Sequence, residues 1–173
     1  MTDYNKYADQ QPYPQIGAME ANEEYVKLLM DDYAGKDSEL TAITQYTFQH
    51  FIKGGGNMEV AQMVMAIAQA EMKHYALLGE AIEKLGGDPK CKGGHGSNGD
   101  YWTGRNPDYS MSPTEILEAN IQAEKTAIEN YTKHAEIIDY PSIKNLLKRI
   151  IRDEEIHLML YTNLLKRIGY KEN

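Results

Sequence analysis

The sequence predicts an all-α protein, and specifically a four-helix bundle with one long crossover between the second and third helices. Two observations support this prediction. The apolar residues are mainly Ile, Leu and Met, with only three Val and two Phe, so residues that favour strands are scarce. Four stretches also repeat apolar residues at spacings of three, four and seven, as a helix with one buried face requires. A length of 173 residues is typical of a single domain.

The first half of the chain predicts two long helices. The first covers about residues 19–53, and Gly35 interrupts it, so a kink or a restart is expected two or three residues later. Three glycines at 54–56 cannot cheaply stay helical and end this helix. Asn57 is a suitable N-cap for a second helix over residues 58–85.

The second half repeats this plan after a long connection. Residues 86–111 are rich in Gly, Asn and Pro and show no period, which fits a crossover that runs from one end of the bundle to the other. Ser-Pro-Thr-Glu at 112–115 combines a capping box with Pro at the first helical position, and the third helix then runs to about residue 139. A short turn at 140–142 leads into a fourth helix that ends near residue 168.

The N-terminal segment is different. Residues 1–18 are rich in Tyr, Gln and Pro and have no helical or strand period, so we interpret them as an extended arm that precedes a single domain over residues 19–173. Two states of this arm are compatible with the sequence: a disordered tail, or a segment that packs on a partner subunit.

Charge and composition exclude several classes of protein. Eighteen Lys and Arg against 26 Asp and Glu give a net charge of −8, which argues against a nucleic-acid partner. The longest purely apolar run, residues 63–68, is too short to span a membrane, and no signal peptide is evident. A single cysteine excludes a disulfide framework and a four-cysteine electron-transfer module. We therefore expect a soluble, cytoplasmic protein.

An internal repeat relates the two halves. The nine residues from Glu39 (ELTAITQYT) match the nine from Glu124 (EKTAIENYT) at six positions. Each block is followed by Glu-x-x-His, at 71–74 and at 154–157. The duplication predicts equivalent carboxylates on the first and third helices of a two-fold related bundle.

The polar residues of this repeat indicate a metal site. A Glu and a His three residues apart lie on one side of a helix, and here both pairs interrupt an otherwise apolar stripe. A buried carboxylate costs several kcal/mol unless a positive group pairs with it, and no Lys or Arg lies near these levels of the stripes. Two divalent cations would balance the four carboxylates. The candidate ligands are Glu39, Glu71, His74, Glu124, Glu154 and His157.

With these motifs the chain resembles the ferritin-like superfamily of dimetal carboxylate proteins, which includes bacterioferritins, rubrerythrins and manganese catalases. Residues 28–46 (LLMDDYAGKDSELTAITQY) are similar to manganese catalases in particular. The resemblance implies bridging roles for Glu71 and Glu154, terminal roles for Glu39 and Glu124, and one imidazole for each metal. It also implies that two phenols hydrogen-bond to ligating carboxylates across the bundle. These phenols belong to Tyr46 and Tyr131.

The chain also departs from rubrerythrins. They carry an extra carboxylate near the site on the third helix, whereas the positions three residues either side of Glu124 are Ile121 and Ala127. They usually carry a four-cysteine domain as well, so a peroxidase of this kind would need an external electron donor.

These features lead to one functional hypothesis and two alternatives. The hypothesis is a homo-oligomeric oxidoreductase with two Fe or two Mn ions, or a mixture, that acts on O₂ or H₂O₂ as a peroxidase, catalase or ferroxidase. The first alternative is ferritin-type iron storage. The second is a structural coat or shell protein that keeps the metals for stability.

Three further groups stand outside this site. Cys91 and His95 in the crossover lack additional ligands, so Cys91 is interpreted as a free thiol. His50 and His134 follow the repeated blocks at similar offsets, and they are either satisfied histidines or part of a proton or metal path. Glu155 is expected at the rim, about 100° around the helix from Glu154.

Overall fold

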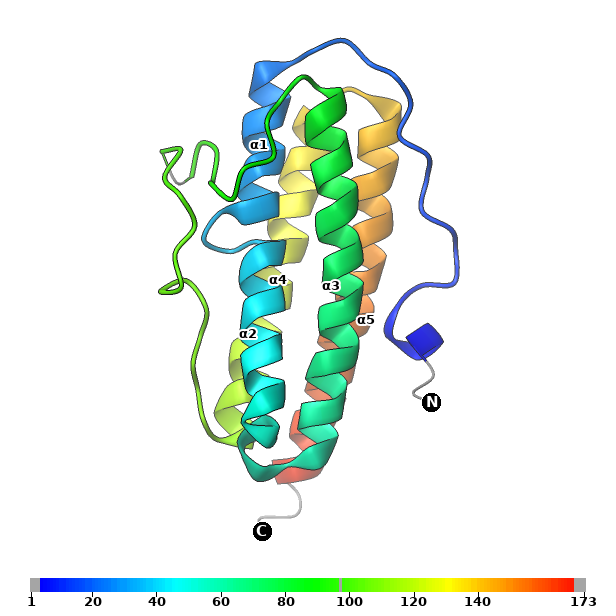
Figure 1. The fold of residues 1–173 in the computed structure, drawn as a ribbon. Helices are drawn as coiled ribbons and strands as arrows, with labels where there is room; N and C mark the ends of the chain where they lie inside the picture. Colours follow the sequence, from blue (N-terminus) through cyan, green and yellow to red (C-terminus); the bar gives the residue numbers. More distant parts are fainter. Residues whose placement is uncertain (1–3, 97, 170–173) are drawn as a thin grey trace.

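The computed structural model of the chain describes residues 4–96 and 98–169, and within these residues the fold is helical. One isolated β-bridge, between Lys92 and Tyr101, lies in the crossover. The α-helices are α1 (Glu23–Ala34), α2 (Glu39–Phe51), α3 (Met58–Lys84), α4 (Pro113–Ile137) and α5 (Pro141–Gly169), with 3₁₀ turns η1 (Tyr4–Tyr7) and η2 (Lys53–Gly56). Helices α1 and α2 follow each other along one edge of the bundle, and α3, α4 and α5 supply its other three edges (Figure 1). The predicted four-helix bundle with one long crossover is therefore confirmed.

The predicted interruption of the first helix separates α1 from α2. Gly35 is the C-cap of α1, and its N–H donates to the Asp31 carbonyl at 3.0 Å. Ser38 then caps α2, because its hydroxyl accepts from the N–H of Thr41. The start of α1 is later than the sequence indicated. Asn22 is its N-cap and accepts from Tyr25 N–H, which satisfies a free helix-end donor and leaves residues 19–21 outside the helix.

The crossover runs along α1 and α2 (Figure 1), and side chains of these helices hold it there. The Trp102 indole N–H donates to Thr41 Oγ1 at 2.9 Å, and the backbone N–H of Asp108 donates to Gln45 Oε1 at 2.7 Å. Higher up, the Asp31 carboxylate accepts from the backbone N–H groups of Gly94 and Gly96. The connection is therefore anchored over the length of the broken helix.

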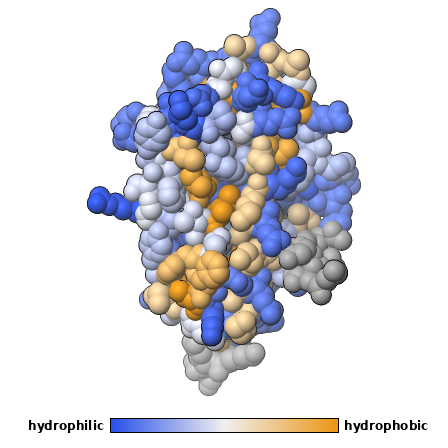
Figure 2. Space-filling model, viewed as in Figure 1, coloured by the Kyte–Doolittle hydropathy of each residue, from blue (hydrophilic) through white to orange (hydrophobic). Residues whose placement is uncertain are grey.

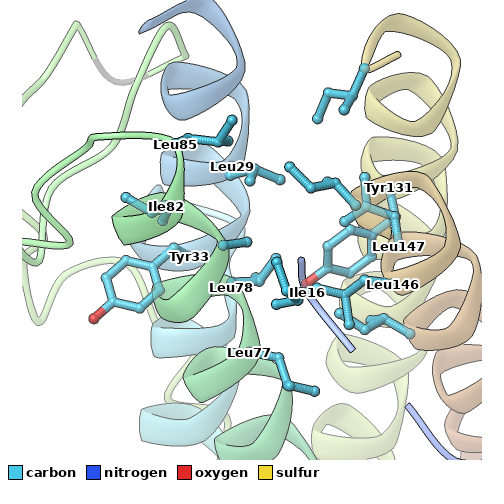
Figure 3. Packing of buried hydrophobic residues seen from close by; sticks show 14 of the residues in the cluster. Ile16, Leu29, Tyr33, Leu77, Leu78, Ile82, Leu85, Tyr131, Leu146 and Leu147 are labelled. Carbon is cyan, nitrogen blue, oxygen red and sulfur yellow. The ribbon is translucent and has the colours of Figure 1, made fainter. Parts of the chain in front are cut away.

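The apolar core consists of two clusters with a polar layer between them. The upper cluster, shown in part in Figure 3, combines residues of α1, α3, α4 and α5 with Ile16 of the N-terminal segment. The lower cluster combines residues of α2, α3, α4 and α5 with Tyr7. On α3 the lower cluster ends at Ala68 and the upper one begins at Leu77. Glu71 and His74 occupy the gap, and the same holds for the Glu-x-x-His motif of α5.

The N-terminal segment lies against the outside of the bundle, on the far side from the crossover (Figure 1). Arg149 of α5 holds it by donating to the backbone carbonyls of Gln11 at 2.7 Å and Asp9 at 2.6 Å. Lys84 of α3 donates to the Ile16 carbonyl, and the Ile16 side chain is buried in the upper cluster. The arm therefore packs on the bundle of its own chain.

The face that Figure 2 shows is mostly hydrophilic, with an apolar patch toward its lower end. Among the described residues, Phe51 is the most exposed large apolar side chain, and Met58 and Met111 are also exposed. None of the helices in the described part of the chain is both long and apolar enough to cross a bilayer.

Candidate metal centre

The structure brings the six candidate ligands together in the polar layer, and all six are buried. They form two overlapping groups. In the first, His74 Nδ1 lies 2.8 Å from Glu71 Oε2, 3.2 Å from Glu154 Oε1 and 3.6 Å from Glu39 Oε1. In the second, His157 Nδ1 lies 2.8 Å from Glu154 Oε2, 3.2 Å from Glu71 Oε1 and 3.7 Å from Glu124 Oε2. The ligand atoms of each group lie within 4.8 Å of one another, which is a spacing that one cation could fill.

The two groups are related by the internal repeat. Glu71 and Glu154 belong to both, and each turns one carboxylate oxygen toward each histidine. Glu39 belongs only to the His74 group, and Glu124 only to the His157 group. The arrangement therefore offers two shared and two unshared carboxylates, the pattern that two neighbouring cations require.

Two tyrosines cross the bundle to reach the unshared carboxylates. Tyr46 of α2 donates its hydroxyl hydrogen to Glu124 Oε1 of α4 at 2.7 Å. In the same way, the Tyr131 hydroxyl of α4 donates a short hydrogen bond to Glu39 Oε1 of α2. Both phenols are buried, so each holds its carboxylate in one orientation.

The charges of the cluster are balanced by protons in the metal-free chain. Burial, reinforced by the nearby Glu71 charge, raises the pKa of Glu39 well above its usual range and that of Glu124 to about 8. Burial also opposes ionisation of Glu71, but His157 and His74 outweigh it and lower the pKa of Glu71 to about 2. Although burial opposes it, the surrounding carboxylates raise the pKa of both histidines. In the metal-free chain, protons on these groups therefore offset negative charge that cations would otherwise balance.

Two buried ligand atoms that lack a hydrogen-bond partner indicate that cations fit this site. Glu154 Oε2 and His157 Nδ1 have no hydrogen-bond partner among the described residues, although they lie only 2.8 Å apart. A buried polar atom without a partner costs about 1–3 kcal/mol. A cation placed among these donors would satisfy both atoms, and a mixed set of carboxylate and imidazole donors suits iron or manganese. The residues present thus fit two such ions.

A cavity of about 260 Å³ reaches the site between α2 and α4. It touches all four carboxylates and neither histidine. Its wall is open because small residues, Ala42 on α2 and Ala119, Ala123 and Ala127 on α4, stand where larger side chains would fill it. Two exposed carboxylates, Asp37 and Asp108, line it. A small molecule or a cation can therefore reach the carboxylates from this side.

The groups that contact the outer nitrogens of the histidines were not among the residues predicted from the sequence. Asp153 is fully buried, accepts from His74 Nε2 at 3.0 Å and forms an ion pair with Arg149 at 2.6 Å. The i,i+4 spacing of Arg149 and Asp153 was a visible signal for this pair. Tyr13 and the backbone carbonyl of Tyr7 complete the contacts from the arm, and no local pattern marked them.

The other residues considered from the sequence lie elsewhere. Cys91 is a free, exposed thiol with its Sγ 3.6 Å from the Tyr75 hydroxyl, whereas His95 pairs with Glu24, so the two form no common site. His50 contacts the Ala61 carbonyl at 2.9 Å.

His134 is the exception, because it lies close to the cavity. It contacts the buried carboxylate of Asp32 at 2.7 Å, and Asp32 lines the cavity. Burial raises the pKa of Asp32 to about 6 despite this contact.

Comparison with known proteins agrees with this geometry. The sequence profile of the rubrerythrin family matches residues 34–165 of this chain. A bacterioferritin from Desulfovibrio desulfuricans is 30% identical over 138 residues, which cover 76% of this chain and 72% of that protein. An X-ray structure of a bacterioferritin from Desulfovibrio desulfuricans, described by its diiron site, is 27% identical, with a TM-score of 0.67 and coverage of 85% and 81%.

A second structure shares the fold more closely. The manganese catalase KatB from Anabaena superposes with a TM-score of 0.83 over 93% of this chain and 80% of that chain, at 24% identity. At that identity the likeness shows the fold alone.

The bundle and its paired Glu-x-x-His motifs place the chain in the ferritin-like class of dimetal carboxylate proteins. Within that class, the match over residues 34–165 shows that it belongs to the rubrerythrin family.

Proposed function

We propose that this protein is a dimetal oxidoreductase that acts on O₂ or H₂O₂, with two Fe or two Mn ions held by Glu39, Glu71, His74, Glu124, Glu154 and His157. The observation that supports it best is the pair of buried, overlapping ligand groups at the end of a cavity wide enough for a small oxidant.

Different residues around this site have different roles in the proposed reaction. Two redox-active ions held side by side would supply the electrons for reduction or disproportionation of the oxidant. The shared carboxylates of Glu71 and Glu154 would hold both ions, while the phenols of Tyr46 and Tyr131 hold the unshared carboxylates in place. The cavity would admit substrate from the carboxylate side, whereas Tyr13 and Tyr7 of the N-terminal arm contact the outer nitrogens of the histidines.

The proposed function also concerns an electron donor and includes assembly with further copies of the chain. A peroxidase of this type would draw electrons from an external donor, since the chain has one cysteine and cannot build a four-cysteine module. We also propose a cytoplasmic homo-oligomer, a dimer or larger.

Iron storage is the second candidate function. It is favoured by the similarity to a bacterioferritin and by the exposed Asp37 and Asp108 at the cavity, which suit the passage of a cation. The third possibility, a structural coat or shell protein that uses the metals for stability, rests only on the Tyr-rich arm.

Metal analysis of protein purified without chelators, combined with a peroxide-decay assay, tests the main proposal. We expect close to two Fe or Mn per chain and metal-dependent peroxide loss. Glu71→Ala and Glu154→Ala should abolish turnover while the fold is retained. Glu155→Ala is the matched control, since this neighbour of Glu154 is exposed. A chain that contains little metal and takes up none on addition would refute the metal site.

Two further results separate the alternatives. A 24-subunit cage that accumulates many iron atoms per chain would favour storage, and a dimer would count against it. Two bound metals without oxidant turnover in any assay would favour the structural role.

A further inference from the structure

The repeat makes the inner ligands symmetric, but the contacts outside the histidines are not symmetric. We propose that the N-terminal arm is part of the metal centre and makes its two metal positions inequivalent, the Glu39–His74 position binding more tightly than the Glu124–His157 position. This inference rests on the proposed metal site but on no particular reaction.

His74 has a negatively charged partner. Its Nε2 lies 3.0 Å from Asp153 Oδ2 and 3.2 Å from the Tyr13 hydroxyl. Tyr13 in turn donates to Asp153 Oδ2 at 2.6 Å, and Arg149 pairs with Asp153 Oδ1. The outer nitrogen of His74 therefore faces a carboxylate that is paired with Arg149.

His157 has a neutral partner instead. Its Nε2 donates to the backbone carbonyl of Tyr7 at 2.8 Å, and the Tyr7 side chain is buried in the lower cluster. The contact again comes from the arm, but from a residue that brings no charge. The two imidazoles thus have the same inner surroundings and different outer ones.

The repeat shows why His157 has no counterpart of this carboxylate. The position that precedes Glu71 on α3 is Ala70, which corresponds to Asp153 before Glu154 on α5. Likewise Ala66 stands where α5 carries Arg149. An ion pair behind His157 is therefore missing from the sequence, and the arm supplies a carbonyl in its place.

The charge difference has a known effect on metal binding. A carboxylate that accepts the outer N–H of an imidazole makes the inner nitrogen a stronger donor than a carbonyl does, and loss of such a partner typically costs about 10–100-fold in metal affinity. The arm also orders the Asp153 group itself. Arg149 stacks on the Tyr13 ring at 4.3 Å and donates to two carbonyls of the arm. Asp153 and Tyr13 are therefore positioning residues for His74.

Calorimetric titration of the metal-free full chain with Mn²⁺ tests this inference. The unaltered protein should take up two ions in two resolved steps. Asp153→Asn should weaken the first step by about 10–100-fold and leave the second almost unchanged. Tyr13→Phe keeps the ring against Arg149 but removes both hydroxyl contacts, so it should weaken the same step by less.

A second variant acts on the other position. Deletion of residues 1–8 removes the carbonyl that His157 contacts and keeps Asp9 and Tyr13, so it should weaken only the second step. Glu155→Gln is the control for a charge change beside a ligand at the exposed surface. Thermal melting of each metal-free variant reports whether its fold is intact.

The outcomes separate the two proposals. Two ions bound with the same affinity, or variants that weaken both steps equally while melting normally, would overturn the inequivalence and leave the proposed function standing. Failure of the unaltered protein to bind two ions would overturn the proposed function and this inference together. Selective loss of one step in Tyr13→Phe supports the inference even where Asp153→Asn does not fold.

Discussion

The two halves of the bundle supply equivalent ligands from different surroundings. The first half is interrupted: α1 and α2 are separate helices, the turn into α3 contains glycines at positive φ, and the crossover packs along its surface. The second half is continuous, with two uninterrupted helices joined by a short turn. Access to the site lies beside the interruption, because the cavity is lined by the turn before α2, by α2 itself, by Asn106 and Asp108 near the end of the crossover, and by α4. The repeat thus determines the ligands, and the departures from it determine access.

Removal of the metal is the largest change available, because it removes the group that would join the halves. In the metal-free chain the folded-state pKa of Glu124 is about 8, above its usual 4.5, so the native state holds a proton that the unfolded state releases. The stabilisation that comes from this Glu124 proton should therefore be full below about pH 4.5 and be lost, by a few kcal/mol in order of magnitude, as the pH rises through about 8.

The metal-loaded protein should behave in the opposite way, since binding requires deprotonated ligands. At 100 times the dissociation constant each ion adds about 2.7 kcal/mol. Urea unfolding at several pH values, with and without a chelator, measures both curves. Parallel curves would contradict the metal proposal.

The turn that joins the helices of the first half should tolerate substitutions less well than the turn of the second half. Gly55 has φ of +66°, and a Cβ there would lie 2.4 Å from the Met111 carbonyl oxygen and 2.7 Å from Pro113 N. Gly55→Ala should therefore destabilise the protein by about 2–4 kcal/mol in chemical denaturation, as strained substitutions do. Asp139→Ala in the turn of the second half is the control, because Asp139 is exposed, and should stay within about 0.5 kcal/mol. Equal effects would mean that both turns are equally adaptable.

The crossed tyrosines test the symmetry of the halves directly. Tyr46→Phe and Tyr131→Phe each remove one hydrogen bond to a buried carboxylate. Each should cost about 1–3 kcal/mol in the metal-free protein, since one carboxylate loses its partner. Thermal melting compares them, and similar losses are expected. A loss confined to one variant would show that only one half depends on its phenol.

The smallest effect on stability is expected at the cavity. Ala123→Leu places a larger side chain in the wall between α2 and α4, partly exposed, so the free energy of unfolding should change by less than about 1 kcal/mol. Metal uptake and peroxide turnover should slow, with the equilibrium metal content unchanged. Stopped-flow uptake measures this. Lys125→Leu, on the exposed side of α4, is the control. Unchanged rates would show that substrate enters elsewhere.

Much of this fold could be predicted because its signals are local. The capping box at Ser112, the glycines that end α2 and the spacing of each Glu-x-x-His lie within a few residues of one another. The place of the arm could not be predicted, because Tyr13 and Asp153 are 140 residues apart and no nearby pattern links them. The cavity could not be predicted either, because alanines are common in any helix and their spacing on α4 does not by itself indicate an opening. The ligand roles stay a prediction until metal is measured.

The break at Gly35 has a consequence for local opening. It leaves α1 as a helix of 12 residues, a length at which an isolated helix is marginal in water. Its order therefore depends on side chains such as Leu29 and Tyr33 packed in the upper cluster. Helix α1 can unfold at a lower free energy than α3 or α5, while Glu39 remains in place on α2. Amide hydrogens of α1 should accordingly exchange with solvent before those of the helices that carry the Glu-x-x-His motifs.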